Sequence, residues 1–141
     1  MPVAKKSAHP VKNARVSRLT PMEKMQLSKS GVSKKYLEKV KEKTMLDYQK
    51  LAVVLSINRA TLINKKQDEK FSPAQSERII GLEALYNQGL EVFQDKEKLN
   101  DWLNAPNRAL GGKMPYEVMD NQFGREEVLN LLGRIQWGVY S

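Results

Sequence analysis

Apolar residues recur every three to four positions along most of the chain from residue 33 onward. This spacing is typical of helices that bury one face, and no segment shows the alternation of apolar and polar residues that a strand needs. The last such stretch follows Gly124 and places apolar residues at i, i+3, i+4 and i+7, namely Val128, Leu131, Leu132 and Ile135. We therefore predict an all-α protein without an internal repeat.

Three short helices are predicted between residues 33 and 66. Ser33 is expected to cap the first and Asp47 the second, because both side chains can accept a hydrogen bond from a free N–H in the first helical turn. The stretch Ser56-Ile57-Asn58 ends the second helix, and the third runs from about residue 59 to residue 66. The inward positions are Tyr36, Leu37 and Val40, then Leu51, Val54 and Leu55, then Leu62 and Ile63.

A long helix is predicted to begin at Ser72-Pro73, since Ser is a good cap and Pro suits the first helical position. Asp95 caps a shorter helix, and Pro115 starts another. Gly81 and Gly89 either weaken the long helix or permit close approach of a neighbouring one. The expected core positions are Ile79, Leu82, Tyr86 and Phe93 in the long helix and Leu99, Trp102 and Leu103 in the shorter one.

Residues 1–31 show little periodicity and mix prolines with scattered Lys, Arg and Ser. We predict a loosely ordered basic segment, in which Thr20-Pro21 starts one short helical turn that carries Met22, Met25 and Leu27. Residues 1–18 are interpreted either as a solvated tail or as an arm that grasps DNA.

Charge is divided unevenly between the two halves of the chain. Residues 1–70, the front half, hold 17 Lys and Arg against 6 Asp and Glu, whereas residues 71–141, the back half, hold 7 against 10. The net charges of +11 and −3 indicate that the front half can bind a polyanion such as nucleic acid and that the back half has a different task.

Residues 47–66 have the dimensions of a helix-turn-helix motif. Ala52 is small where two helices must cross, although Ser56 stands where such motifs usually have Gly. The outward positions offer hydrogen-bonding and cationic groups that suit base edges and phosphates. The alternative is a helical hairpin with a solvated basic face, but the surrounding charge favours DNA binding. The candidate DNA-binding residues are Asn58, Arg59, Thr61, Asn64, Lys65 and Lys66.

Several classes of function are disfavoured by what the chain lacks. It contains no cysteine, which excludes disulfides, thiolate zinc sites and cysteine nucleophiles and agrees with a cytoplasmic location. No apolar run approaches the roughly 20 residues of a membrane span, and no secretory signal follows the N-terminal lysines. His9 is the only histidine, and no glycine-rich phosphate loop or metal-ligand cluster is present. We predict a protein that is not an enzyme and uses no cofactor or metal.

The back half carries a set of short motifs that stand in a fixed order. Its most distinctive stretches are Trp102 to Pro115, which contains Leu110-Gly111-Gly112, and the last ten residues, Leu132 to Ser141. Further motifs are Phe71-Ser72-Pro73, Glu77-Arg78, Val92-Phe93 and Gly124. Taken together, roughly residues 46–141 resemble the Xre/MbcA/ParS family of type II antitoxins.

This resemblance implies an Xre-like helix-turn-helix domain followed by a helical toxin-binding domain. We place a flexible basic segment at residues 1–31, the DNA-binding domain at 32–70 and the toxin-binding domain at 71–141. The resemblance further implies a dimeric bacterial antitoxin that blocks the active site of a RES-domain toxin, an NAD-consuming enzyme, with its C-terminal region. The same family represses its own operon by binding operator DNA.

The end of the chain supplies the candidate toxin contacts. Trp137, Val139 and Tyr140 offer large contact area at low rotamer cost, and Gly138 lets the backbone turn. Arg134 can pair with an acidic feature of a partner. The alternative is that Trp137 and Tyr140 fold back onto the core of their own chain. The predicted toxin-binding set is Arg134, Trp137, Gly138, Val139, Tyr140 and Ser141.

Two positions depart from the family pattern. Met114 precedes Pro115 where relatives often have Thr or Ser, and the stretch Asn121 to Gly124 lacks the more usual Thr before Gly. Both departures remove a possible helix cap, so we expect less firm helix starts at these two places.

Two other functions compete with the antitoxin. One is a stand-alone transcription regulator whose back half senses or dimerises only, and the other is an interaction protein whose front domain no longer binds DNA. A neighbouring gene for a RES-type toxin would favour the antitoxin over the regulator. A salt-sensitive gel shift on the protein's own promoter would argue against the interaction protein that no longer binds DNA.

Overall fold

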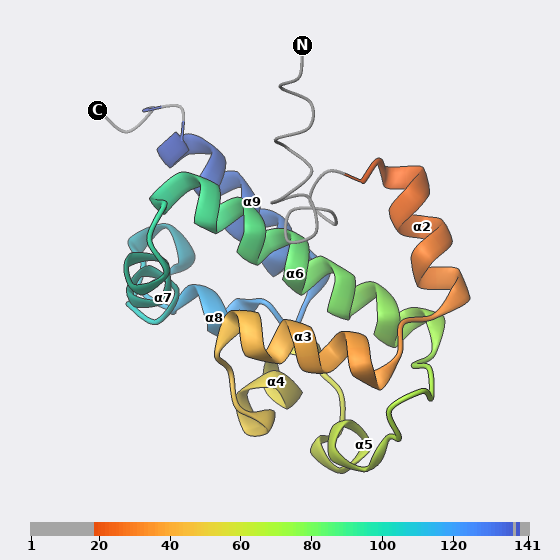
Figure 1. Cartoon of the computed structure of the whole chain (residues 1–141). Coiled ribbons are helices and arrows are strands. Elements are labelled where there is room, and N and C mark those ends of the chain that lie inside the picture. The colour runs from red at the N-terminus through yellow and green to blue at the C-terminus, as the bar shows by residue number, and fades with distance from the viewer. Residues whose placement is uncertain (1–18, 137, 139–141) are drawn as a thin grey trace.

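The computed structural model describes residues 19–136 and residue 138. Within this part of the chain every regular element is a helix, and the one β-type pairing is an isolated antiparallel bridge between Ser33 and Lys70. Helix α6, Pro73–Phe93, runs through the middle of the molecule, with the other helices arranged around it (Figure 1). The all-α prediction is confirmed for the described residues.

Three helices of the front half form as the sequence predicts. They are α3, Lys34–Thr44; α4, Tyr48–Leu55; and α5, Arg59–Asn64. The Ser33 side chain accepts a hydrogen bond from Tyr36 N, and the Asp47 side chain accepts one from Lys50 N. These local bonds satisfy N–H groups that a helix start leaves free, which explains why both boundaries are readable from sequence.

The front half contains one further helix, α2, Pro21–Ser30, which is longer than the single turn predicted. Thr20 and Glu23 form a reciprocal capping box at its start, and Gly31, with φ 88°, ends it. Periodicity did not reveal α2 because its apolar and polar residues are not segregated to opposite faces. It packs against α6, so residues 21–30 belong to the folded body. The expectations for residues 1–18, including His9, lie outside the described residues.

In the back half, α6 is followed by α7, Lys96–Leu103; the 3₁₀ helix η1, Arg108–Leu110; α8, Pro115–Val118; and α9, Gln122–Gln136. Ser72 caps α6 and Asp95 caps α7, as predicted. A Cβ atom built on Gly89 would lie 2.5 Å from Leu99 Cδ1. Glycine at this position therefore permits the close approach of α7 to α6, which is one of the two roles considered for it.

The start of α9 corrects the prediction that this helix follows Gly124. The helix begins at Gln122, and Gly124 lies in its first turn. The Asn121 side chain accepts a hydrogen bond from Phe123 N at 2.8 Å, so it supplies the cap that the sequence pattern had suggested was missing. A Cβ built on Gly124 would lie only 1.8 Å from the backbone oxygen of Val118, which requires glycine where α9 passes the end of α8. Met114 makes no side-chain cap bond to α8, as expected.

One connected hydrophobic core spans both halves of the chain. It joins Leu37, Leu51 and Leu62 of the front half to Tyr86 and Leu132 of the back half. Ile63 does not join it, contrary to the prediction, and is 38% exposed. Successive helix positions point about 100° apart, so the short α5 turns Leu62 inward and Ile63 outward.

The described residues contain neither a membrane-spanning helix nor a metal-ligand cluster. No helix in this part of the chain has the length and apolar character that crossing a bilayer requires. The same residues contain no group of three or more His, Cys, Asp or Glu side chains placed to hold a metal ion.

Candidate functional site

Helices α4 and α5 form a helix-turn-helix at one end of the molecule. The turn residue Ser56 adopts the left-handed conformation, with φ 56°, and its N–H donates to the carbonyls of Ala52 and Val53. Glycine is the usual residue for this conformation, so Ser56 takes it at some conformational cost. Buried Ile57 and Leu62 anchor the turn and α5 to the core, as predicted.

Four of the six predicted DNA-contacting residues are exposed, on α5 or beside its ends; the helix ends at Asn64, two residues before its predicted end. Arg59, Asn64 and Lys66 are exposed. Asn58 is exposed as well, but its side chain is engaged as the helix cap and accepts a hydrogen bond from Ala60 N at 2.8 Å. Thr61 is half-buried.

Lys65 differs from the outward orientation that the sequence analysis predicted. Its ammonium group donates to the carbonyl oxygen of Lys70 at 3.2 Å and lies 4.9 Å from the centre of the Phe71 ring. Both interactions direct Lys65 toward Lys70 and Phe71, just before α6, so its side chain stabilises that segment.

Two cations from neighbouring helices hold the ends of the motif. Arg78 of α6 donates to the carbonyl oxygen of Leu55 at 2.6 Å, at the end of α4. Lys34 of α3 donates to the carbonyl oxygens of Ile63 and Lys65, both at 3.0 Å, at the end of α5. Helix ends leave carbonyls unsatisfied and carry partial negative charge, so both cations stabilise the motif from outside it.

A tyrosine and a carboxylate surround Lys34. Glu38, one turn further along α3, lies 3.7 Å from Lys34 Nζ and accepts a hydrogen bond from the Tyr48 hydroxyl. Burial, followed by the hydrogen bond and charge of Glu38, raises the pKa of Tyr48 to about 12. The phenol therefore stays protonated and donates at neutral pH.

A second polar cluster joins α3 to α6. Glu83 accepts hydrogen bonds from the Tyr36 hydroxyl at 2.5 Å and from Lys43 Nζ at 2.7 Å. Lys43 also donates to Asn87 at 3.3 Å. Burial, with Glu83 adding to the effect, raises the pKa of Tyr36 above its ordinary value. This largely buried ion pair, with the tyrosine hydroxyl, connects α3 to the central helix.

The far end of the molecule carries the other predicted site. Gln88 of α6 donates to Gln136 at 3.0 Å and ties down the last residue of α9. Gly138 follows with φ 67°, and its N–H donates to Ile135 O at 3.1 Å. Arg134 is exposed and lies 3.9 Å from Glu127. The remaining predicted toxin contacts, Trp137, Val139, Tyr140 and Ser141, lie outside the described residues.

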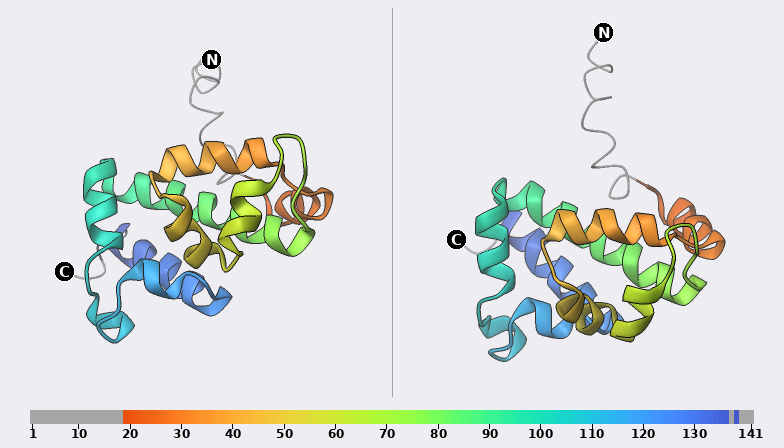
Figure 2. Two further views of the ribbon diagram at one scale, coloured as in Figure 1. Left: turned by 90° about the horizontal axis from the view of Figure 1, so that it is seen from below. Right: turned by 60° about the horizontal axis from the view of Figure 1, so that its bottom comes forward.

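The two predicted sites are well separated. The C-terminal end of α9 and helix α5 lie on opposite sides of the molecule in each view (Figures 1 and 2). The structure therefore does not bring the described toxin-site residues, Arg134 and Gly138, near α5.

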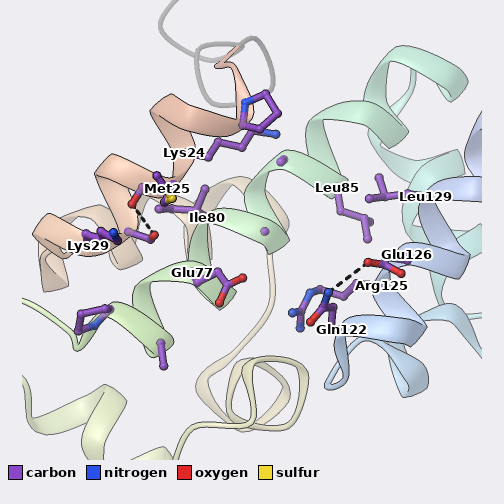
Figure 3. A pocket seen from close by; sticks show the side chains of 16 residues that line it. Lys24, Met25, Lys29, Glu77, Ile80, Leu85, Gln122, Arg125, Glu126 and Leu129 are labelled. Atoms are coloured by element: carbon purple, nitrogen blue, oxygen red, sulfur yellow. Dashed lines mark hydrogen bonds between the residues drawn. The ribbon is translucent and has the colours of Figure 1, made fainter.

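A third surface was not predicted from sequence. A groove of about 580 Å³ lies between α2 and α9, with α6 as its floor (Figure 3). Gly81 and Ala84 line the floor, and the side walls present Met25 and Leu129, which are 38% and 40% exposed. Helix α2, whose length the sequence pattern underestimated, forms one wall, so the sequence gave no sign of the groove.

Charges around the groove are divided between its walls. Lys24 and Lys29 stand on α2, whereas Glu77 stands on α6 and Glu126 on α9 (Figure 3). Within the described ranges, neither lysine forms an ion pair. Arg125 reaches across Gly81 and donates to Met119 O at 3.1 Å, and burial lowers the pKa of its guanidinium.

Comparison with known families agrees with this arrangement. Residues 23–83 match the antitoxin Xre-like helix-turn-helix domain, and residues 88–138 match the antitoxin Xre/MbcA/ParS C-terminal toxin-binding domain. The first match reaches back to α2 and α3, well before residue 46, where the sequence resemblance was placed. Both matches adjoin within α6, while the domain bounds of 32–70 and 71–141 remain a prediction.

Curated relatives are named as antitoxins. The chain is 31% identical over 85 residues to an antitoxin Xre of Yersinia enterocolitica and 34% identical over 73 residues to an antitoxin Xre of Photorhabdus laumondii. These matches cover 60% and 51% of this chain but only 57% and 49% of the relatives, so the chain spans about half of their length. It is also 28% identical over 135 residues to a Prs ADP-ribosylating antitoxin of a Sphingobium strain, covering 88% of this chain and 84% of that protein.

A solved structure shares the fold. The chain superposes with a TM-score of 0.56 on a chain from the crystal structure of the MbcT–MbcA toxin–antitoxin complex of M. tuberculosis. The likeness covers 77% of this chain and 96% of that one, at 17% sequence identity. With its helix-turn-helix domain and its toxin-binding domain in the same order, the chain belongs to the Xre/MbcA/ParS family of antitoxins.

Proposed function

We propose that this protein is an antitoxin that neutralises a cognate RES-domain, NAD-consuming toxin and represses its own operon. The observation that carries the proposal is that a basic helix-turn-helix and a toxin-binding domain share one core, with helix α5 and the C-terminal end of α9 on opposite sides of it. The partner surfaces do not compete for the same residues. Toxin neutralisation and operon repression would both be achieved by binding a partner.

The front half supports operator binding through its charge and its exposed helix. Arg59, Asn64 and Lys66 are free to face a DNA groove, and the front half carries a net charge of +11. Each phosphate that a cation neutralises releases counterions, so binding should weaken steeply with salt. Arg and Asn are also the side chains that pair most often with guanine and adenine edges.

The back half supports toxin binding through the well-anchored helix α9, which leads to the predicted contact residues. Buried Val128, Leu131 and Leu132 anchor α9, and the bond from Gln88 to Gln136 fixes its last residue. Residues 137–141 follow α9 directly in the sequence. We propose that they enter the active-site mouth of the toxin, with Arg134 pairing at its rim.

The groove supports a homodimer. A second copy related by a two-fold axis would set Lys24 and Lys29 of each protomer against Glu77 and Glu126 of the other. The exposed Met25 and Leu129 would be covered at the same time. For such a dimer, operator half-sites are expected about 34 Å apart or at a multiple of that distance.

Truncation after Gln136 tests the toxin half of the proposal. The truncated chain should retain operator affinity, because α5 lies on the other side of the core, and should fail to rescue growth when the toxin is co-expressed. The matched control is Arg59→Ala, which should weaken operator binding and leave rescue unchanged. Full protection by the truncated chain would refute neutralisation by the C-terminal end.

Single substitutions test the dimer surface. Leu129→Glu places a charge in the groove and should convert the dimer to a monomer in sedimentation experiments. The control Met45→Glu changes a residue that is 66% exposed and lies away from the groove, so it should leave the dimer intact. Lys24→Glu should weaken the dimer, and adding Glu126→Lys should restore it. A dimer that tolerates Leu129→Glu would place the interface elsewhere.

A further inference from the structure

Lys34 is a buried cation in the most basic part of the chain. It is 5% exposed, whereas its neighbour Lys35 is exposed. Two of its three N–H donors go to the carbonyl oxygens of Ile63 and Lys65, and the ammonium group faces Glu38 at 3.7 Å. Its donors are therefore directed into the protein and are not available to a DNA phosphate.

Helix α5, whose C-terminal end Lys34 contacts, is too short to be stable without tertiary contacts. Helix α5 has six residues, and an isolated helix of that length is unstable in water. Its start is anchored by the Asn58 cap and its inner face by Leu62. Lys34 satisfies two carbonyls at its other end and places a positive charge against the negative end of the helix dipole.

Lys34 also links α5 to the first helix of the motif. Glu38 binds Lys34 on one side and the hydroxyl of Tyr48, the first residue of α4, on the other. The Lys34 ammonium lies 5.7 Å from the centre of the Tyr48 ring. A change at Lys34 would therefore alter the direction of α5 relative to α4.

We infer that Lys34 is a positioning residue for DNA reading, which sets the orientation of α5 and contributes no phosphate contact of its own. This inference rests on the proposed function, since it assumes that α5 lies against the operator. Lys34 acts through the side chains of α5, so its loss should reduce discrimination between sequences more than it reduces general affinity for DNA.

The experiment compares Lys34→Met with Lys35→Met, which remove the same charge from adjacent positions of α3. Affinity is measured for the operator and for a scrambled duplex over a range of salt. Lys34→Met should lower operator affinity about ten-fold or more, because two charge-assisted hydrogen bonds are lost, and leave the scrambled duplex and the salt slope unchanged. Lys35→Met should weaken both duplexes equally or not at all.

Equal loss on both duplexes in Lys34→Met, with a shallower salt slope, would overturn the inference by making Lys34 an ordinary phosphate contact. Unchanged discrimination would overturn it as well. If Lys34→Met does not fold, Tyr48→Phe removes the partner of Glu38 while keeping the lysine, and a smaller loss of discrimination is then expected.

Hydrogen exchange gives a readout that needs no DNA. The amides of Leu62 and Lys65, which bond within α5, should exchange at least about ten times faster in Lys34→Met, while amides of α6 keep their rates. Faster exchange throughout the protein would overturn the inference, since it would assign Lys34 to general stability. If the wild-type protein does not distinguish operator from scrambled DNA, the proposed function fails, and the exchange result still decides whether Lys34 holds α5.

Discussion

The front and back halves hold their helices together by different means. In the front half, short helices are fixed by side chains that reach helix ends, as Lys34 does for α5 and Arg78 for α4. In the back half, two glycines admit close neighbours, which are the Leu99 side chain at Gly89 and the Val118 backbone at Gly124. Loss of charge at Lys34 or Arg78 should therefore loosen the front half, whereas a methyl group added at Gly89 or Gly124 should disturb the back half.

The largest effect is expected at Gly124. Gly124→Ala places a Cβ 1.8 Å from the Val118 oxygen, so α8 or α9 must shift, and the free energy of unfolding should fall by about 2–3 kcal/mol. Gly133→Ala, on the same helix with nothing within 4 Å, should instead raise it by about 0.5–1 kcal/mol. Urea unfolding measures both, and equal effects would refute the close backbone contact.

A smaller effect is expected at Gly89. Its added Cβ would meet the end of the flexible Leu99 side chain at 2.5 Å, which can move more easily than a backbone oxygen. Gly89→Ala should therefore cost about 1–2 kcal/mol. The double change of Gly89→Ala with Leu99→Val frees space at Leu99 and should cost less than the sum of the two single changes in the same unfolding assay.

Left-handed caps allow a matched comparison between the halves. Ser56 ends α4 with φ 56°, and Gln94 ends α6 with φ 54°. Glycine takes this conformation without steric cost, so Ser56→Gly and Gln94→Gly should each stabilise the protein by about 0.5–1 kcal/mol in thermal unfolding. A gain at only one position would show that the left-handed backbone is strained at that cap and not at the other.

The smallest effect concerns alkaline pH and belongs to the front half. The pKa of Tyr48 is raised to about 12, and that of Tyr36 is raised too, so both phenols stay protonated in the folded state beyond the ordinary titration near pH 10. Their contribution to stability is full below about pH 10 and is lost as pH rises toward the folded pKa values. Urea midpoints at pH 8, 9.5 and 10.5 should fall, and the fall should be smaller in the Tyr36→Phe, Tyr48→Phe double variant.

Much of the fold could be predicted because helix boundaries depend on local chemistry. The caps Ser33, Asp47, Ser72 and Asp95 all act within their own first turn, and each is confirmed. Helix α2 was underestimated because its burial depends on α6, more than 40 residues away, and leaves little amphipathic pattern in its own sequence. The start of α9 was misplaced because Gly124 was taken as a helix boundary, whereas Asn121 supplies the cap and the helix begins at Gln122.

The DNA-binding surface was predicted in part for the same reason. The exposure of Arg59 and Asn64 follows from helical spacing around the buried Leu62. The inward turn of Lys65 depends on Phe71, and the burial of Lys34 depends on the end of α5, neither of which spacing within one helix can reveal.

Helix α6 crosses from one family domain into the other without a break, since the matches end at residue 83 and resume at residue 88. Because α6 is continuous, its length fixes how the two halves are rotated and spaced relative to each other, in addition to the core that they share. Inserting one residue between Glu83 and Gln88 would turn the toxin-binding end by about 100° and advance it by about 1.5 Å relative to the DNA-binding end. Chimaeras between relatives should work only when their junction preserves the length of this helix.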